Sequence, residues 1–195
     1  MEQLQGRNGG EGVGIGSRFN CEGVCGVKLF ICGYARHGKD FAAETLRGLY
    51  GLKFESSSHF AMRQCVRREL ANKYDLTYDS YEDCFKDRVN HRSKWFDIIR
   101  DYNKEDPARL ARELFAENDI YVGMRSCAEL DACVDEGLTD LIIWVDAVDR
   151  IDTIESTHSM DITASDADFI ITNNGTRGEF IRKLARIFDK LQINA

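Results

Sequence analysis

The sequence has 195 residues, of which 43% are hydrophobic and 30% are charged, and its formal net charge is −7. This length suits one buried core, so we expect a single domain with insertions. The acidic balance, with a pI near 5.2, argues against a nucleic acid polymer or an anionic membrane as partner. There is no apolar run of about 18 residues, the length a membrane helix needs.

The sequence contains seven cysteines, a number that fits free thiols in a reducing compartment. We expect a cytoplasmic protein, monomeric or homodimeric.

The start of the chain differs in composition from the rest. Residues 1–27 contain eight glycines and few large apolar side chains. Ordering such a segment loses backbone entropy with little burial in return. We therefore interpret residues 1–27 as a flexible glycine-rich tail and residues 28–195 as the folded domain.

From Lys28 onward, short apolar runs alternate with segments of helical periodicity, which is typical of βα units around a parallel sheet. We expect five strands, near residues 29–32, 52–55, 120–122, 141–145 and 169–171. Apolar stripes predict helices between them, and Asp106 with Pro107 resembles the start of one. The last helix has the cleanest stripe, with Phe180, Leu184 and Phe188 on one face.

The loop after the first strand carries the strongest chemical signal. Gly33-Tyr34-Ala35-Arg36-His37-Gly38-Lys39-Asp40 matches the G-x-x-x-x-G-K pattern, follows a strand and opens a helix, as a phosphate-binding loop requires. Glycines let successive backbone N–H groups converge on phosphate oxygens, the helix N-terminus adds its positive dipole end, and Lys39 supplies a point charge. We predict ATP binding here and expect His37 to face solvent. The alternative is a glycine turn that only leads into a helix.

Asp40 departs from the usual pattern, in which a Ser or Thr follows the lysine and binds Mg²⁺. A carboxylate can also hold Mg²⁺, directly or through water. Two interpretations stay open: Asp40 contacts the metal, or it caps the helix or pairs with an arginine.

Together these segments resemble the phage-type deoxynucleoside monophosphate kinases, in the P-loop nucleoside monophosphate kinase group. The resemblance covers about residues 28–193. It rests on Gly38-Lys39-Asp40, on residues 121–125 closing a strand, and on residues 161–163 followed by 167–176. It implies an α/β P-loop three-layer sandwich with a five-stranded parallel sheet, ATP and Mg²⁺ as cofactors, a nucleoside monophosphate as substrate, and a location in the host cytoplasm if the gene is a phage gene.

The resemblance also implies roles for particular segments. An acceptor-binding helical insertion would span about residues 56–105 and a short lid about residues 147–167, where Arg150 would close over the transferred phosphoryl group. Asn173, Asn174 and Gly175 would line the ATP adenine pocket; the alternative is a simple turn before a helix capped by Thr176.

Three arginines are the candidates for the acceptor phosphate. Arg125 ends a strand at the edge where doubly wound sheets bind ligands; the alternative is a surface ion pair with Glu129. Arg88 and Arg92 are one helical turn apart and would face the acceptor together, unless they belong to a solvated basic face.

We therefore predict a phosphotransferase that moves the γ-phosphoryl group of ATP to a nucleoside or deoxynucleoside monophosphate, and we expect the deoxynucleotide as acceptor. Lys39, Arg125 and Arg150 would be catalytic. Two alternatives stay open, because fold alone does not fix function. One is another small-molecule P-loop kinase, such as a dephospho-coenzyme A kinase, and the other is a nucleotide-binding module without catalysis.

Overall fold

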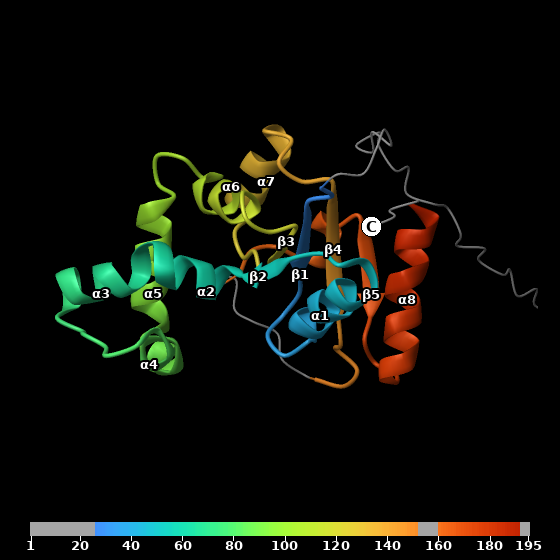
Figure 1. The fold of residues 1–195 in the computed structure, drawn as a ribbon, viewed down its shortest axis with the longest axis horizontal. Helices are drawn as coiled ribbons and strands as arrows, with labels where there is room; N and C mark the ends of the chain where they lie inside the picture. Colours follow the sequence, from blue (N-terminus) through green and yellow to red (C-terminus); the bar gives the residue numbers. More distant parts are fainter. Residues whose placement is uncertain (1–25, 152–159, 192–195) are drawn as a thin grey trace, which may run out of the picture.

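The computed structural model describes residues 26–151 and 160–191. In this part of the chain, five strands form one sheet with helices on both faces (Figure 1). The strands are β1 (Leu29–Cys32), β2 (Phe54–Ser56), β3 (Ile120–Val122), β4 (Leu141–Asp146) and β5 (Phe169–Thr172). The helices are α1 (Lys39–Tyr50), α2 (Ser57–Ala61), α3 (Arg67–Tyr74), α4 (Tyr81–Asp87), α5 (Arg92–Tyr102), α6 (Arg109–Phe115), α7 (Cys127–Asp135) and α8 (Arg177–Lys190).

The strand order is β2-β3-β1-β4-β5, and every neighbouring pair is parallel. The five-stranded parallel sheet expected from the sequence is therefore confirmed. β1 lies in the centre, and the chain runs to β3 on one side and β4 on the other. The carboxyl end of β1 is thus the point where strand order reverses, which is where doubly wound sheets form a ligand crevice.

Alternating side chains of the central strand β1 are part of two hydrophobic cores, one on each face of the sheet. Leu29 and Ile31 pack on the face covered by α1 and α8, with Leu46 and Leu184. Phe30 and Cys32 face the other side, where α2, α5, α6 and α7 contribute the core residues. Both faces of the sheet are covered, which accounts for the continuous apolar runs of β1 and β4.

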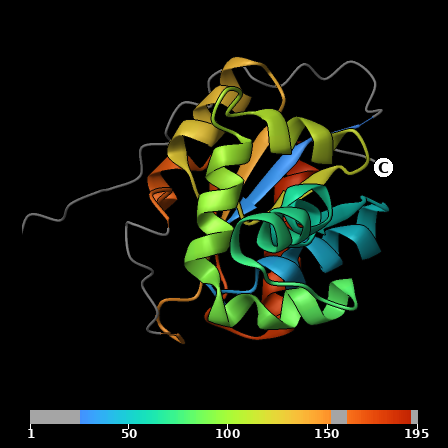
Figure 2. The ribbon, with the colours of Figure 1, turned by 90° about the vertical axis from the view of Figure 1, so that its left-hand side faces the viewer.

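Helices α3, α4 and α5 lie at one end of the molecule, beyond the edge of the sheet (Figure 1), and in front of β1 when the molecule is turned (Figure 2). The connection from α2 to α3 is a single π-helical turn, Met62–Val66, rather than a break. Such turns insert one extra residue and rotate the following helix. Ser57 of α2 can therefore face the end of β3 while Leu70 of α3 is buried in the core.

Two boundaries differ from those expected. Val27 is buried against the α1–α8 core, so the packed chain begins before Lys28; the rest of the expected tail, residues 1–25, lies outside the described residues. α6 spans Arg109–Phe115, so it begins two residues after the expected start at Pro107. The Asp106 carboxylate accepts the Ala108 N–H, as expected near a helix start, and also binds Arg112 (2.7 Å).

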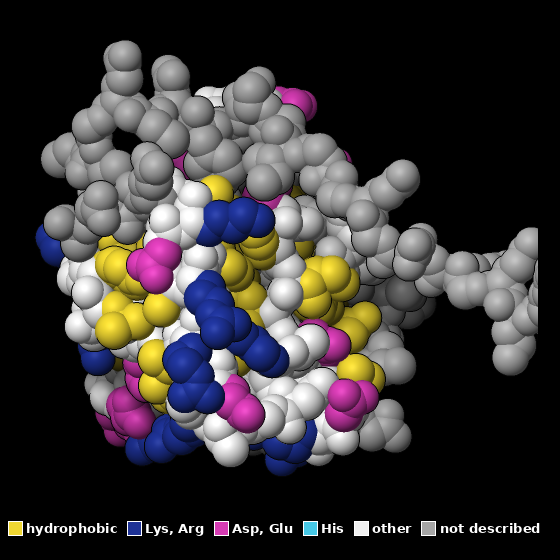
Figure 3. All heavy atoms as spheres, turned by 90° about the vertical axis from the view of Figure 1, so that its right-hand side faces the viewer, with side chains coloured by type: hydrophobic (Ala, Val, Ile, Leu, Met, Phe, Trp, Pro, Cys, Tyr) yellow, Lys and Arg dark blue, Asp and Glu magenta, His cyan; other side chains and the backbone are white. Residues whose placement is uncertain are grey.

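α8 follows the expected pattern. Thr176 caps it by accepting the Glu179 N–H, and the Glu179 carboxylate accepts the Thr176 N–H (2.8 Å). The exposed residues of α8 include Arg182, Lys183, Arg186 and Lys190. Figure 3 shows Lys and Arg side chains gathered in a column on one face of the molecule. No helix in the described ranges is long and apolar enough to cross a membrane.

The stripe of α8 gives a stability prediction. Leu184 is fully buried, so Leu184→Ala should lower the free energy of unfolding by about 2–5 kcal/mol, the range for removing a large aliphatic side chain from a core. Arg186→Ala on the exposed side of the same helix is the control and should stay within about 0.5 kcal/mol. Urea denaturation followed by circular dichroism measures both. Equal losses would mean that α8 is not packed through Leu184.

Candidate active site

The loop of residues 33–38 joins β1 to α1 at the strand-order reversal. Three of its residues have positive φ: Gly33 (137°), Arg36 (67°) and Gly38 (100°). Gly38 is the N-cap of α1 and offers no side-chain cap. The first N–H groups of α1 are therefore open to an anion, which they and the helix dipole favour.

Close packing beneath the loop requires a glycine at its start. A Cβ on Gly33 would lie 2.4 Å from the carbonyl oxygen of Val145 in β4, a distance at which atoms overlap. The missing side chain lets the loop backbone lie directly on the end of β4. Any other residue would push the loop away from the sheet.

His37 does not face solvent, contrary to the sequence prediction; its side chain is fully buried. Its Nδ1 accepts the N–H of Ala147 (3.0 Å), so that nitrogen carries no proton in this arrangement. The 3.6 Å approach of Nδ1 to the Asp146 carboxylate is accordingly not an ion pair. The His37 side chain therefore links the loop to the end of β4.

Asn173 contacts the loop. Its side chain is buried, and Nδ2 donates to the His37 carbonyl (2.9 Å). This hydrogen bond supports the loop from the end of β5, and a contact of Asn173 with an adenine ring stays a prediction. Asn174 donates to Asp149 (2.7 Å) in the turn after β4, and Gly175 is exposed; an ATP role for these two stays a prediction.

Lys39, the first residue of α1, donates from Nζ to the carbonyls of Gly33 and Tyr34, both at 2.7 Å. The ammonium group therefore lies across the mouth of the loop. A Cβ on Gly123, just after β3, would lie 4.0 Å from the Cε of Lys39. The lysine thus lies between the loop and the β3 end.

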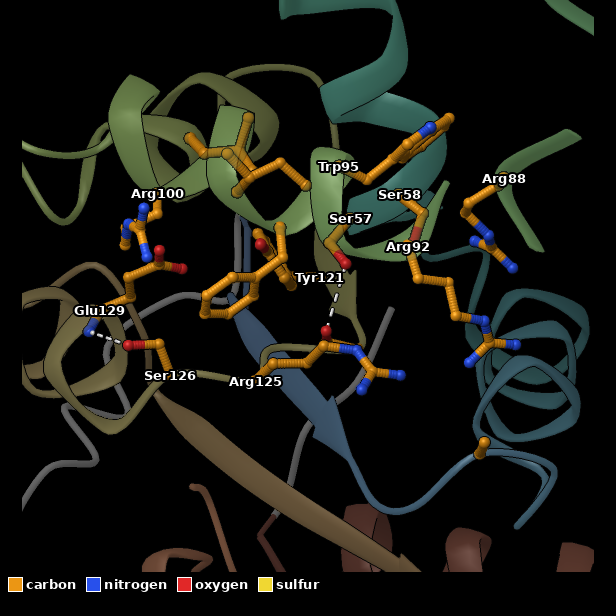
Figure 4. Close-up of a pocket in the computed structure, with 15 residues that line it drawn as sticks. Ser57, Ser58, Arg88, Arg92, Trp95, Arg100, Tyr121, Arg125, Ser126 and Glu129 are labelled. Atoms are coloured by element: carbon orange, nitrogen blue, oxygen red, sulfur yellow. Dashed lines mark hydrogen bonds between the residues drawn. The ribbon is translucent and has the colours of Figure 1, made fainter. Parts of the chain in front are cut away.

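A cavity of about 550 Å³ opens beside the loop, between the ends of β1 and β3 and helices α2, α5 and α7 (Figure 4). Its volume lies within the range of small-molecule sites. Its floor and walls combine apolar and polar groups. They include Ala35 of the loop, Ser57, Trp95, Ile99, Leu110, Tyr121 and Glu129.

Arg88, Arg92 and Arg125 all line this cavity. Burial lowers the pKa of Arg88, and the charges of Arg92 and Arg125 lower it further, whereas Asp40 opposes the shift. The three guanidinium groups therefore repel one another across a common space, which an anion would relieve. Arg88 and Arg92 do not share a helix, because Arg88 is in a 3₁₀ turn and α5 starts at Arg92.

Asp40 is exposed in the first turn of α1. The capping interpretation is wrong, because Gly38 holds the cap position. Its charge raises the pKa values of both Arg88 and His59, so the carboxylate lies within electrostatic range of these two side chains. No group of three or more His, Cys, Asp or Glu side chains in the described residues could hold a metal ion by itself.

Arg150 is exposed in the turn after β4. Much of the expected lid, residues 152–159, lies outside the described residues. A catalytic role for Arg150 stays a prediction.

Several cavity residues were not singled out from the sequence as site residues, among them Ser57, Trp95, Tyr121 and Glu129. Ser57, Trp95 and Tyr121 match ordinary helix and strand patterns and carry no local signal. Ser57 donates to the Gly123 carbonyl (3.1 Å) and Tyr121 is almost fully buried. Glu129 entered only as a partner for Arg125, but no ion pair joins the two in the described part of the chain. Its position in a Ser-x-x-Glu motif at Ser126 was the available signal.

No protein-family model matches the sequence, and no curated protein matches it. The chain is 13% identical to dephospho-CoA kinase from Campylobacter jejuni, covering 84% of this chain and 96% of that one, with a TM-score of 0.50. It is 16% identical to TT1252 from Thermus thermophilus, covering 85% of this chain and 98% of that one, with a TM-score of 0.49. It is 12% identical to shikimate kinase from Aquifex aeolicus, covering 87% of this chain and 100% of that one, with a TM-score of 0.42. The first similarity, with the loop after β1, gives the class: an α/β protein of the P-loop NTPase fold. At this identity the similarity extends to the fold alone.

The stabilising role of the hydrogen bond between His37 and Ala147 is testable. His37→Leu keeps bulk but removes the acceptor for the buried Ala147 N–H, and should lower the free energy of unfolding by about 1–3 kcal/mol, the penalty for one unsatisfied buried group. His37→Asn places an oxygen near the position of Nδ1 and should lose clearly less. Thermal and urea unfolding of both variants decide the matter; equal losses would rule out the hydrogen bond as the cause.

Proposed function

We propose that this protein is a nucleotide kinase that transfers the γ-phosphoryl group of ATP to a nucleoside monophosphate. The observation that carries the proposal is the cavity with Arg88, Arg92 and Arg125, which opens beside the phosphate-binding loop and Lys39. Two anion-binding places side by side are what phosphoryl transfer between two phosphates requires.

In the proposed reaction, an oxygen of the acceptor phosphate attacks the γ-phosphorus of ATP, the bond between that phosphorus and the β–γ bridging oxygen breaks, and ADP leaves. The protein supplies alignment and charge rather than a nucleophile. The loop amides and Lys39 hold the donor phosphates, and the arginines hold the acceptor phosphate. Guanidinium groups suit this task because they bind phosphate oxygens in pairs.

Asp40 is the residue that would hold Mg²⁺, together with phosphate oxygens of ATP. Its carboxylate lies in the first turn of α1, directly after Lys39, and a magnesium ion in such sites commonly takes one or two carboxylates besides phosphates. The metal would neutralise charge that builds up on the phosphates.

A second candidate is a dephospho-coenzyme A kinase-like activity, which is favoured by the fold similarity to the Campylobacter jejuni protein. The acceptor would then also be a nucleotide, but one with a long pantetheine arm. A binding module without catalysis is the third candidate, motivated by Asp40 in place of a hydroxyl residue and by the single arginine, Arg150, within residues 147–167.

The first test measures ADP release from ATP and Mg²⁺ with each nucleoside monophosphate, each deoxynucleoside monophosphate and dephospho-coenzyme A in turn. We expect stimulation by one or more of the monophosphates, and a loss of at least about 100-fold in kcat for Lys39→Ala, since a positioned charge at the transferred group is worth this much. Stimulation by dephospho-coenzyme A alone would favour the second candidate. ATP binding without acceptor-dependent turnover would favour the third.

The arginines allow a separate test of the acceptor side. Arg88→Gln and Arg125→Gln should each raise the KM for the acceptor by about 10- to 100-fold, the value of one or two charge-assisted hydrogen bonds, while the KM for ATP stays nearly constant. Arg186→Gln on the far face of α8 is the matched control for loss of one positive charge. An equal rise in both KM values would contradict the assignment of these arginines to the acceptor.

A further inference from the structure

The two ends of the cavity carry different chemistry (Figure 4). Arg88, Arg92 and Arg125 gather at one end. Glu129 and Arg100 lie at the other, and Tyr121 lies between the two groups. If the acceptor phosphate occupies the arginine end, the rest of the acceptor extends toward Glu129. This inference therefore rests on the proposed function.

Glu129 lies in a Ser-x-x-Glu motif, in which the Glu carboxylate normally accepts the backbone N–H of the cap residue. Ser126 caps α7 by accepting the Glu129 N–H (3.4 Å), as Thr176 caps α8 for Glu179. Glu179 returns its carboxylate to the backbone N–H of its cap residue. Glu129 makes no such return contact in the described part of the chain, where α7 has no complete capping box. Its carboxylate lines the cavity instead.

The surroundings do not neutralise this carboxylate. Within residues 26–151 and 160–191 it forms no ion pair, and Arg100 at the same end pairs with Asp97 (2.9 Å). Burial raises the pKa of Glu129, the Asn103 amide opposes the shift, and the Asp161 carboxylate adds to it. The buried Asn103 amide interacts with this carboxylate, but its Nδ2 makes no hydrogen bond of normal geometry in the described residues. A half-buried carboxylate without a cation is unfavourable unless a ligand supplies donors.

The geometry points to Glu129 as a base-reading residue that selects guanine in the acceptor nucleotide. A carboxylate has two acceptor oxygens and no donor. Guanine presents a ring N–H and an amino group side by side, which match both oxygens. Adenine and cytosine place a ring acceptor beside their amino group, and uracil and thymine flank their N–H with carbonyls, so each of these sets a lone pair against the carboxylate. Arg100, beside Glu129, offers donors for the guanine carbonyl oxygen.

The test compares guanosine and inosine monophosphates, in whichever sugar form the protein accepts, because inosine lacks only the amino group. The wild-type protein should favour guanosine over inosine monophosphate in kcat/KM by about 10- to 100-fold, the effect of one hydrogen bond to a charged group. Glu129→Gln keeps the size but replaces one oxygen by a donor, and should bring that ratio close to one. The KM for ATP should not change.

Asp131→Asn, on an exposed position of the same helix, is the matched control and should leave the ratio as in the wild type. Circular dichroism and thermal melting establish that both variants are folded. A ratio unchanged by Glu129→Gln, or a wild-type preference for a different base, overturns the assignment and leaves the kinase intact. Absence of turnover with every acceptor overturns the proposed function, and this inference with it.

Discussion

The phosphate-binding loop depends on being held from below by the ends of two neighbouring strands. Gly33 lies directly on the carbonyl of Val145, Ala147 donates to the His37 ring, and Asn173 donates to the His37 carbonyl. A positive φ is costly for a residue other than glycine, such as Arg36, unless its surroundings fix it. The contacts from the ends of β4 and β5 fix the loop. The amide groups at the start of α1 keep their position only because that support is in place.

Positive side chains gather in the cavity although the net charge of the chain is negative. The protein is acidic as a whole, yet three arginines line one cavity, where burial and the charges of Arg92 and Arg125 lower the pKa of Arg88. Such repulsion reduces the stability of the empty protein and adds to the affinity for an anion. The carboxylate of Glu129, at the other end of the cavity, favours hydrogen-bond donors or a cation instead. A ligand that is anionic at one end and rich in N–H donors at the other fits both.

Much of the fold could be predicted because the information is local. Apolar runs identify β1, β4 and β5, and the stripe of α8 identifies its buried face. The errors have a tertiary origin. His37 was expected to face solvent because the loop pattern leaves its interior positions free, whereas its burial involves the end of β4, more than a hundred residues later. Arg88 and Arg92 were expected on one helix, but the chain turns between them and still delivers both to the cavity. Glu129 was recognised only as an ion-pair partner because a capping motif does not reveal where its carboxylate points.

The π-helical turn between α2 and α3 makes the length of that segment matter as much as its composition. Each residue of a helix turns the chain by about 100°, so deleting one residue would restore a regular helix and swing α3 away from the core position of Leu70, or else pull Ser57 away from the end of β3. Conservative exchanges of side chains along this stretch leave the angle intact. Insertions and deletions do not, and we expect related chains to differ here in residues but not in spacing.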